Sequence, residues 1–406
     1  MNISNTSKAN MPERNSKPIY LDYQATTPTD PDVVEAMLPY FTEKFGNPHS
    51  SGHYYGWEAS DGVEQAREQI ASLIGATHRE IIFTSGATES NNIALKGLAH
   101  FHSSHKSHLI TLASEHKCVL ETCARIEKDG FSVTVLPVQE NGMVDLGVLA
   151  SAITDETLAV SIMAVHNEYG VIQPMQEIGA LCRERGIFFH TDAAQAFGKI
   201  SLDVEAMNID LMSISGHKIY GPMGVGALYV RRRPRVRLAP LFDGGGQERG
   251  VRSGTLPAPL CVGLGVAAEK AGRELAEETD RLTKMRNKML KKLSDEIPGV
   301  SLNGDQGHRI PGNLNLAFAG VSGQDLIAGL KGLAISSGSA CTSASVEPSY
   351  ALKALGLSDD QANSSIRIGL GRFTTDTEAS LAADMIVACV GNLLNHNNVE
   401  LQVNNG

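Results

Sequence analysis

Between residues 80 and 232 the chain alternates short apolar stretches with stretches in which apolar residues recur at helical spacing. The apolar stretches predict strands, and the repeat near 3.6 residues predicts amphipathic helices. The predicted strands are 80–84, 108–113, 131–138, 158–165, 187–191, 210–214 and 226–231, and the predicted helices are 91–100, 117–129, 146–153 and 176–185. This alternation is typical of an α/β fold in which helices cover both faces of a mostly parallel seven-stranded sheet.

The pattern changes near residue 258. A long charged amphipathic helix is predicted over 260–297, and a smaller α+β unit follows, with strands at 314–318 and 366–369 and a C-terminal helix at 376–394. We therefore predict a large domain of residues 28–260 and a small domain made of residues 1–27 and 261–406. The extended piece 20–27 could pack on either unit.

Composition narrows the class of protein. The 406 residues are 42% hydrophobic, which is enough for a large core, and the net charge is −10. An acidic chain of this kind is expected to bind neither nucleic acid in general nor a membrane surface. One basic run, Arg231 to Arg237, departs from that balance. It is either a solvated strand end or a local docking patch for an acidic partner.

The cysteines and histidines give little sign of a metal site. Six cysteines are scattered without a C-x-x-C pair, which indicates neither a zinc ribbon nor a disulfide framework. The cluster His100, His102, His105 and His108 has no Cys or acidic partner, so we expect a solvated loop and no metal. Free thiols, a polar N-terminus and the lack of an apolar run near 18 residues predict a cytoplasmic protein.

Chemically useful residues follow the predicted strands at the point where each strand ends. They are Thr88, His116, Asn167, Asp192, Gln195, Ser215, His217 and Lys218. In an open α/β sheet, ligands bind beyond the carboxyl ends of the strands. Because five strands bring such residues to one edge, we expect a single site there.

Several of these residues suit a phosphorylated aldehyde cofactor. The small-residue turn Ser85–Asn91 precedes a helix and could bind a phosphate with its N–H groups and the Thr88 hydroxyl, although an ordinary helix cap would look the same. Asp192 at a buried strand end needs a cationic partner such as a protonated pyridine nitrogen. The ring of His116 could stack on a cofactor and exchange protons near neutral pH. Lys218, once neutral, could form a Schiff base with an aldehyde.

Two further residues point to the substrate. Arg367 is isolated in an apolar strand, where its guanidinium would suit a substrate carboxylate or an internal salt bridge. Cys341 lies in a loop of small residues, Ser336 to Ser345, and could act as a nucleophile that carries a group away. Together with Lys218 it suggests chemistry on a sulfur-containing amino acid.

Residues 18–390 closely resemble the cysteine desulfurases of the housekeeping iron–sulfur cluster type, which are fold-type-I pyridoxal-phosphate enzymes of the class V aminotransferase group. The resemblance rests on the motifs at 21–28, 45–50, 83–91, 213–222, 244–250, 252–255 and 337–343. It implies conversion of L-cysteine to L-alanine, with the sulfur passing through a persulfide on Cys341 to an iron–sulfur scaffold protein or another acceptor.

The resemblance also implies a role for each matching residue. Lys218 would bind pyridoxal 5'-phosphate covalently and shuttle protons, His116 would stack on the ring and act in acid–base steps, and Asp192 and Gln195 would bind the ring nitrogen and ring hydroxyl. Ala87, Thr88, Ser215 and His217 would hold the phosphate, joined by Thr255 from the second subunit of a homodimer. Asn167 and Arg367 would position the substrate, with Asn167 also close to the cofactor.

The chain departs from the family pattern at a few positions. His166 precedes Asn167 where Asn is more usual, Met223 stands where a lysine is common, and the tail after Leu394 lacks the aromatic and basic segment with which many members bind the scaffold protein. Three readings remain open: a cysteine desulfurase, another class V enzyme such as an aminotransferase or selenocysteine lyase, and a non-catalytic assembly protein with the same fold.

Overall fold

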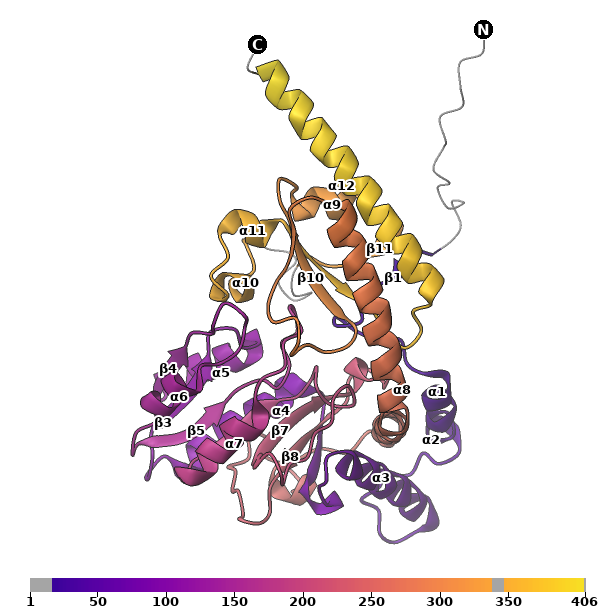
Figure 1. Ribbon diagram of the computed structural model, residues 1–406. Helices are drawn as coiled ribbons and strands as arrows, with labels where there is room; N and C mark the ends of the chain where they lie inside the picture. The colour runs from indigo at the N-terminus through magenta and orange to yellow at the C-terminus, as the bar shows by residue number, and fades with distance from the viewer. Residues whose placement is uncertain (1–16, 338–346, 405–406) are drawn as a thin grey trace.

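Seven strands form the central sheet of the computed structural model, which describes residues 17–337 and 347–404 (Figure 1). The strand order is β2-β8-β7-β6-β5-β3-β4, and every neighbouring pair is parallel except the two pairs that include β8. The strands are β2 (Ile81–Thr84), β3 (His108–Leu112), β4 (Ser132–Leu136), β5 (Thr157–Ser161), β6 (Phe188–Asp192), β7 (Leu211–Ser215) and β8 (Gly226–Val230). The predicted α/β fold with a mostly parallel sheet is confirmed.

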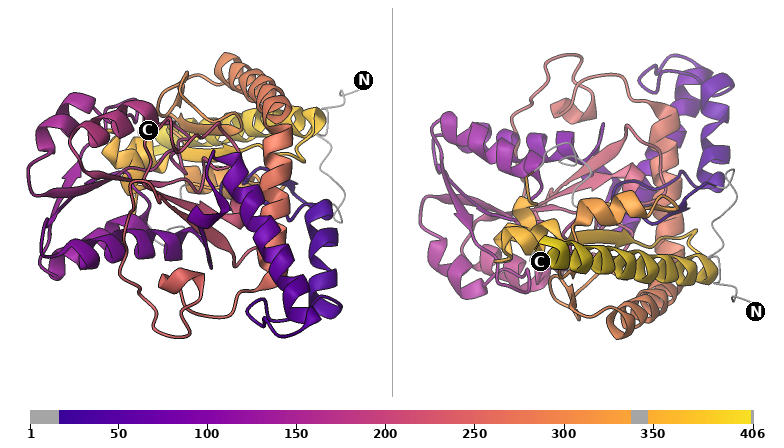
Figure 2. Two further views of the ribbon diagram at one scale, coloured as in Figure 1. Left: turned by 90° about the horizontal axis from the view of Figure 1, so that it is seen from below. Right: turned by 90° about the horizontal axis from the view of Figure 1, so that it is seen from above.

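Most of these strands are buried on both faces, because successive side chains enter two different hydrophobic clusters. Ile82 and Leu109 pack toward α4 (Ala87–His102) and α5 (Lys117–Lys128), whereas Phe83 and Ile110 face the opposite cluster. This opposite cluster, the first core of the molecule, is covered by α3 (Tyr54–Leu73), α6 (Leu146–Ala152), α7 (Met175–Glu184) and the first part of α8 (Ala258–Glu296). Helices accordingly lie on both sides of the sheet (Figure 2).

The helix after β2 begins earlier than the sequence predicted. We expected a helix over 91–100, but α4 starts at Ala87, two residues after the strand region ends. Gly86 has φ of +149°, a conformation that favours glycine and lets the chain pass from strand to helix at once. As a result, the N-terminus of α4 lies at the edge of the sheet where the predicted site was expected.

A smaller core surrounds a three-stranded antiparallel sheet with the order β12-β10-β9. Its elements are β9 (Val300–Leu302), β10 (Asn313–Phe318), β12 (Ser365–Gly369), α9 (Gly323–Gly329) and α12 (Asp376–Asn404). The short helices α10 (Tyr350–Ala354) and α11 (Asp359–Asn363) pack instead in a separate cluster with Tyr169 and Val171. In Figure 1, α8 runs from the lower sheet into this upper unit. Its residues Cys261 to Ala268 belong to the first core, and Leu282 to Leu293 belong to the second.

The N-terminal segment joins the two units. β1 (Ile19–Tyr20) pairs with β11 (Leu333–Ala334), and Leu21 packs in the second core. A few residues later, the N–H of Thr27 donates to the carbonyl of His217 beside the large sheet, at 3.0 Å. The short helices α1 (Pro31–Met37) and α2 (Pro39–Thr42) then lead to α3.

Helix α12 is the one helix in the described part of the chain whose length and composition would suit a membrane span, with a mean hydropathy of 1.3 over Asp376–His396. Its buried positions form one face, which packs on the second core and consists of Ala379, Ala382, Ala383, Ile386 and Val390. The window also contains Glu378 and Asp384. The covering of a small sheet therefore accounts for the apolar face of α12.

Candidate active site

A pocket that encloses about 1430 Å³, part of it open to solvent, lies at the carboxyl ends of the strands. Almost every predicted site residue of the described chain lines it: Ala87, Thr88, His116, Asn167, Asp192, Gln195, Ser215, His217, Lys218 and Arg367. Nine of these come from the large sheet unit, and Arg367 comes from β12 of the second core. The convergence predicted from the strand ends is thus present in the structure.

Lys218 ends a short 3₁₀ turn, Gly216–Lys218, which directly follows β7. Its Nζ donates to the carbonyl oxygens of Gln24 at 2.8 Å and Ala25 at 2.7 Å. The N-terminal segment therefore holds the ammonium at the pocket through its backbone. Sequence reasoning recognised this segment as a motif but did not assign it a role in the site.

Asp192 is the last residue of β6 and is buried. Its carboxylate accepts from Asn91 Nδ2 at 2.7 Å and from the N–H of Ala194 at 2.9 Å. Both donors are neutral, so they orient the carboxylate without compensating its charge. A cationic group that enters the pocket would supply that compensation. Asn91 was not predicted as a site residue, and its only signal was its place in the motif after β2.

His116 is the N-cap residue of α5, and its Nδ1 accepts from the N–H of Cys118 at 3.2 Å. Because Nδ1 is an acceptor, a neutral ring carries its proton on Nε2. Burial lowers the pKa of His116, and the charge of Lys218 lowers it further while Asp192 opposes the shift. The ring is therefore neutral near pH 7 and presents an Nε2–H group.

Two groups beside His116 were missed by the sequence analysis. The Sγ of Cys118 lies 3.0 Å from His116 Nδ1, and burial raises the pKa of this thiol to about 12, so it stays protonated. The carboxyl of Glu115 is fully buried and accepts from the N–H of Met163 at 2.6 Å. Burial raises the pKa of Glu115 well above its usual range, and the charge of Asp192 raises it further, which favours the neutral carboxyl.

The N-terminus of α4 forms one end of the pocket. Its N-cap, Gly86, offers no side chain to cap the first N–H groups, and Ala87 and Thr88 line the pocket beside Ser215. No side chain of the N-cap residue therefore competes for the first N–H groups of this helix. His217 Nδ1 lies 3.0 Å from Thr26 Oγ1, and burial lowers the pKa of His217 to about 4. This end of the pocket thus offers hydroxyls, a neutral imidazole and the positive end of a helix dipole, which together suit a phosphate.

Arg367 approaches the pocket from the other unit and is almost fully buried. Its Nη2 pairs with Asp22 Oδ1 at 2.8 Å, and its Nη1 donates to the carbonyl of Asn167 at 3.0 Å. Its Nε is buried without a hydrogen-bond partner among the described residues. The internal salt bridge is present, and the unpartnered Nε leaves the guanidinium able to accept a further anionic ligand.

Two predicted residues lie elsewhere. Thr255 lines a separate surface hollow together with Phe242, Arg252 and neighbouring glycines. Cys341 lies outside the described residues. The described chain on either side of it is tied to the site, because Ser336 Oγ donates to Asp22 Oδ2 at 2.8 Å and Tyr350 OH donates to the carbonyl of Glu115 at 2.8 Å.

The other features raised by the sequence have local structural explanations. Both ring nitrogens of His108 lie 2.8 Å from threonine hydroxyls, those of Thr157 and Thr134, which leaves neither nitrogen for a metal. In the basic run, Arg231 is buried and donates to Glu205 at 2.8 Å, whereas Arg232, Arg233, Arg235 and Arg237 are exposed. Most of this run is therefore a solvated strand end, as in the first of the two readings of the sequence.

Pyridoxal 5'-phosphate fits this set of donors and acceptors. An uncompensated carboxylate (Asp192) suits its ring nitrogen, the uncapped start of α4 suits its phosphate, and Lys218 lies in the same pocket. Gln195 is buried at the pocket wall, where its amide could meet a ring substituent. A neutral imidazole (His116) lines the same pocket.

Comparison with known proteins gives a consistent result. The sequence profile of the family described as aminotransferase class V matches residues 19–381. A protein called cysteine desulfurase IscS from Rickettsia africae is 59% identical over 376 residues, which cover 93% of this chain and 92% of that protein.

Solved structures agree with this. A NifS-like protein superposes with a TM-score of 0.86 at 36% identity, covering 92% of this chain and 99% of that one. A structure described as SspA in complex with cysteine has a TM-score of 0.79 at 41% identity, covering 88% of this chain and all of that one.

Proposed function

The chain belongs to the class V aminotransferase family and, within it, to the cysteine desulfurases, and from that membership we propose that it converts L-cysteine to L-alanine and passes the sulfur to Cys341 as a persulfide. Pyridoxal 5'-phosphate is the cofactor. The observation that carries the proposal is the convergence of Lys218, Asp192, His116 and Arg367 on one pocket from two separate cores.

The proposed cofactor contacts follow from the pocket. Lys218 Nζ binds the aldehyde, Asp192 pairs with the ring nitrogen, and the Gln195 amide meets the ring oxygen. A second set holds the phosphate: Ala87, Thr88, Ser215, His217 and, from the partner subunit of a homodimer, Thr255. When bound, pyridoxal 5'-phosphate withdraws electrons from Cα of the amino acid and so stabilises the charge that remains when the α-proton leaves.

The residues around the substrate have separate roles in binding and proton transfer. Arg367 and Asn167 orient the substrate carboxylate, and the buried setting of Arg367 makes that charge-assisted hydrogen bond strong. Lys218 Nζ takes the α-proton. His116 presents Nε2–H to the pocket and returns a proton during the reaction. The thiolate of Cys341 attacks the substrate sulfur: the new S–S bond forms, the S–Cβ bond breaks, and Cβ gains a proton to give alanine.

A homodimer is part of the proposal. Five exposed aromatic residues gather on α2, α3 and the segment between them: Phe41, Phe45, Tyr54, Tyr55 and Trp57. The rings of Phe45 and Tyr55 stack at 5.4 Å, and those of Tyr54 and Tyr55 meet edge to face at 6.2 Å, so these three residues form an exposed aromatic cluster. Surfaces of this kind mark protein interfaces. A second copy of the chain would cover it.

The remaining assignments complete the picture. The sulfur acceptor is an iron–sulfur scaffold protein or another thiol protein, and the enzyme works in the cytoplasm, where free cysteines such as Cys123 and Cys182 stay reduced. Neither a membrane nor nucleic acid is a partner. We keep the division into a large domain of residues 28–260 and a small domain of residues 1–27 and 261–406 that carries Cys341, although the start of α8, from Cys261 to Ala268, packs in the core of the large domain.

The test is to incubate the purified protein with L-cysteine and to measure alanine and sulfide with and without reductant. Cys341→Ala should abolish cysteine-dependent alanine, and Cys389→Ala, a half-buried thiol outside the pocket, serves as the matched control. Alanine formation undiminished in Cys341→Ala would remove Cys341 from the mechanism. A coloured, cofactor-loaded protein that makes no alanine would favour the other class V reading, with a different amino-acid substrate.

A further inference from the structure

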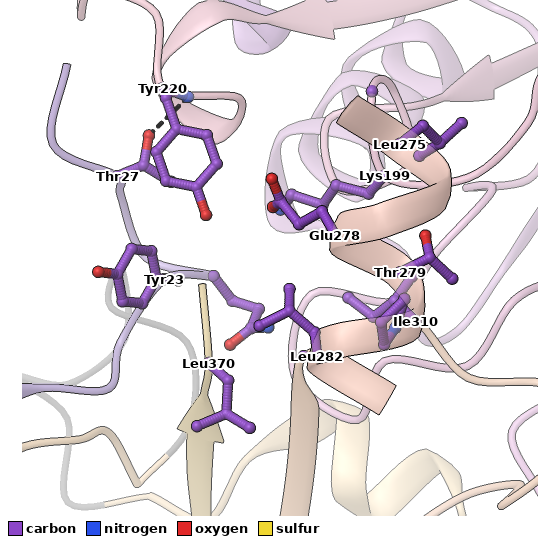
Figure 3. A pocket seen from close by; sticks show the side chains of 14 residues that line it. Tyr23, Thr27, Lys199, Tyr220, Leu275, Glu278, Thr279, Leu282, Ile310 and Leu370 are labelled. Carbon is purple, nitrogen blue, oxygen red and sulfur yellow. Dashed lines mark hydrogen bonds between the residues drawn. The ribbon is translucent and has the colours of Figure 1, made fainter. Parts of the chain in front are cut away.

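A second, smaller cavity lies beside the active-site pocket and shares Gln24 with it. It has a volume of about 440 Å³, part of it open to solvent, and is lined by Lys199, Glu278, Tyr23 and Tyr220, among others. Figure 3 shows these four side chains around the cavity, with Lys199 and Glu278 reaching into it. A lysine in such a place has no part in the proposed reaction, although a charged group inside a protein is costly to keep.

Lys199 is connected to the active site by a short series of hydrogen bonds. Its Nζ donates to Oε1 of Gln195 at 2.9 Å, and Nε2 of Gln195 donates to the carbonyl of Gln24 at 2.8 Å. That same carbonyl accepts from Lys218 Nζ at 2.8 Å. Gln24 O is therefore the shared acceptor of Gln195 and Lys218, the two residues that we assign to the ring oxygen and the aldehyde of the cofactor.

The first of these bonds decides which way the Gln195 amide faces. A protonated lysine has three donors and no acceptor, so only the amide oxygen can face it. The N–H groups of Gln195 must then face Gln24 and the active-site pocket. Without Lys199 only the bond to the Gln24 carbonyl would hold this orientation. A half-turn of the amide, which directs its oxygen toward the electron-rich ring oxygen of the cofactor, would then cost one hydrogen bond less.

We propose that Lys199 is a positioning residue, which fixes the Gln195 amide so that an N–H group meets the ring oxygen of pyridoxal 5'-phosphate. This inference rests on the proposed function and names a residue that acts through another. The charged groups near Lys199 are two positive ones, Lys218 and Arg367, and one negative one, Glu278. Glu278 accepts from Arg372 Nε at 2.9 Å, so its charge is shared.

The balance of these charges leaves Lys199 sensitive to its environment. Burial, and then the charge of Lys218, lowers the pKa of Lys199 to about 7. The tyrosines that line the cavity stay neutral, because burial raises the pKa of both Tyr23 and Tyr220. Lys199→Arg should keep a donor and a positive charge beside Gln195.

The experiment compares Lys199→Met, which has no donor, with Lys199→Arg. Lys291→Met is the matched control, because Lys291 also donates to a side chain four residues away, Asp295 at 2.7 Å, but on an exposed surface. Two quantities are measured: the affinity of cofactor-free protein for pyridoxal 5'-phosphate, and the pH midpoint of the visible absorption of the loaded protein. A merely structural role would move neither quantity in a folded variant.

We expect Lys199→Met to bind the cofactor about 3- to 10-fold more weakly, as for one lost hydrogen bond. Its absorption midpoint should rise by on the order of half a pH unit, because the ring oxygen loses an N–H donor that stabilises its negative charge. Lys199→Arg should restore both values, and Lys291→Met should leave both unchanged. Should Lys199→Met not fold, Lys199→Gln, which keeps one N–H but also offers an oxygen, should give part of the same shift.

A double variant makes the test specific. In a Gln195→Leu background, Lys199→Met should have little further effect on the midpoint, because the amide that it positions is gone. An unchanged midpoint in folded, loaded Lys199→Met would overturn the inference. So would a full shift that persists in the Gln195→Leu background. If wild-type protein takes up no pyridoxal 5'-phosphate at all, the proposed function itself fails, and the two failures are thus told apart.

Discussion

Replacing Glu248 by glutamine isolates the contribution of one buried ion pair that links two distant segments. Glu248 is buried and accepts three hydrogen bonds: Oε2 from Arg67 Nη1 at 2.8 Å and from the N–H of Phe83 at 2.6 Å, and Oε1 from Arg67 Nη2 at 2.9 Å. Every partner is a donor. A glutamine of the same shape would turn its NH₂ toward at least one of them, in either orientation.

The geometry sets the size of the effect. Glu248→Gln leaves the buried Arg67 guanidinium with the exposed Glu64, whose Oε1 lies 3.1 Å from Arg67 Nε, as its counter-charge. The loss of the buried partner should cost about 3 kcal/mol in the free energy of unfolding, at the lower end of the range for a broken buried pair. Replacing both partners by apolar residues, as in Arg67→Met with Glu248→Leu, should cost much less, because no charge is left uncompensated. Since Glu248 lies on the segment that leads to Thr255, the single variant should also weaken cofactor binding by the proposed dimer.

Denaturant unfolding of the two single variants and the double variant, at one protein concentration and with saturating cofactor, measures the coupling between the two residues. Asp280→Asn is the control. It removes an exposed partner of Lys284 and should change the free energy of unfolding by less than about 0.5 kcal/mol. The reasoning is refuted if Glu248→Gln is no more costly than Asp280→Asn, or if the double variant loses as much as the two single variants combined.

Three further predictions address the substrate, the pH dependence of stability and assembly. Arg367→Lys keeps the charge but loses the planar guanidinium, so KM for L-cysteine should rise about 10- to 100-fold. An unchanged KM in steady-state kinetics would contradict this prediction. His190 is fully buried and its pKa is lowered to about 4 by burial, so the unfolded chain binds more protons between pH 6.5 and 4. Stability should therefore fall as pH falls through that window, by about 3 kcal/mol from this residue, and denaturant unfolding of His190→Asn should show a flatter profile. Phe45→Glu should halve the mass in sedimentation by placing a charge on the proposed dimer surface, and a dimer of unchanged stability would place the interface elsewhere.

The sequence predicted the central sheet well because its strands are buried on both faces. Continuous apolar stretches such as Leu158–Ser161 stand out from the polar segments around them. Helix α3 was not predicted at all, since its buried face consists largely of small residues, including Gly56, Ala59, Gly62 and Ala66. These residues allow α3 to approach α8 closely, but they give little contrast in hydrophobicity.

The candidate site was predictable where a residue follows a strand end and not where it depends on a partner far away in sequence. Asp192 and Lys218 are recognisable from their positions after β6 and β7. Asn91, which donates to Asp192 from within α4, looks like any polar residue on a helix. Lys199 is likewise indistinguishable in sequence from a surface lysine, because the residues that enclose it come from α8 and from other segments far away in sequence, such as Tyr23 and Leu370.

The path of α8 through both hydrophobic cores bears on how the protein can be dissected. A fragment that ends at residue 260 would lack Cys261, Leu264, Ala267 and Ala268, which fill the core beneath the large sheet. A fragment that starts there would carry those apolar residues with nothing to cover them. We therefore expect that neither piece survives alone and that heat unfolds the whole chain in one cooperative step. The two units contribute different residues to the site, yet we expect them to fold and unfold together.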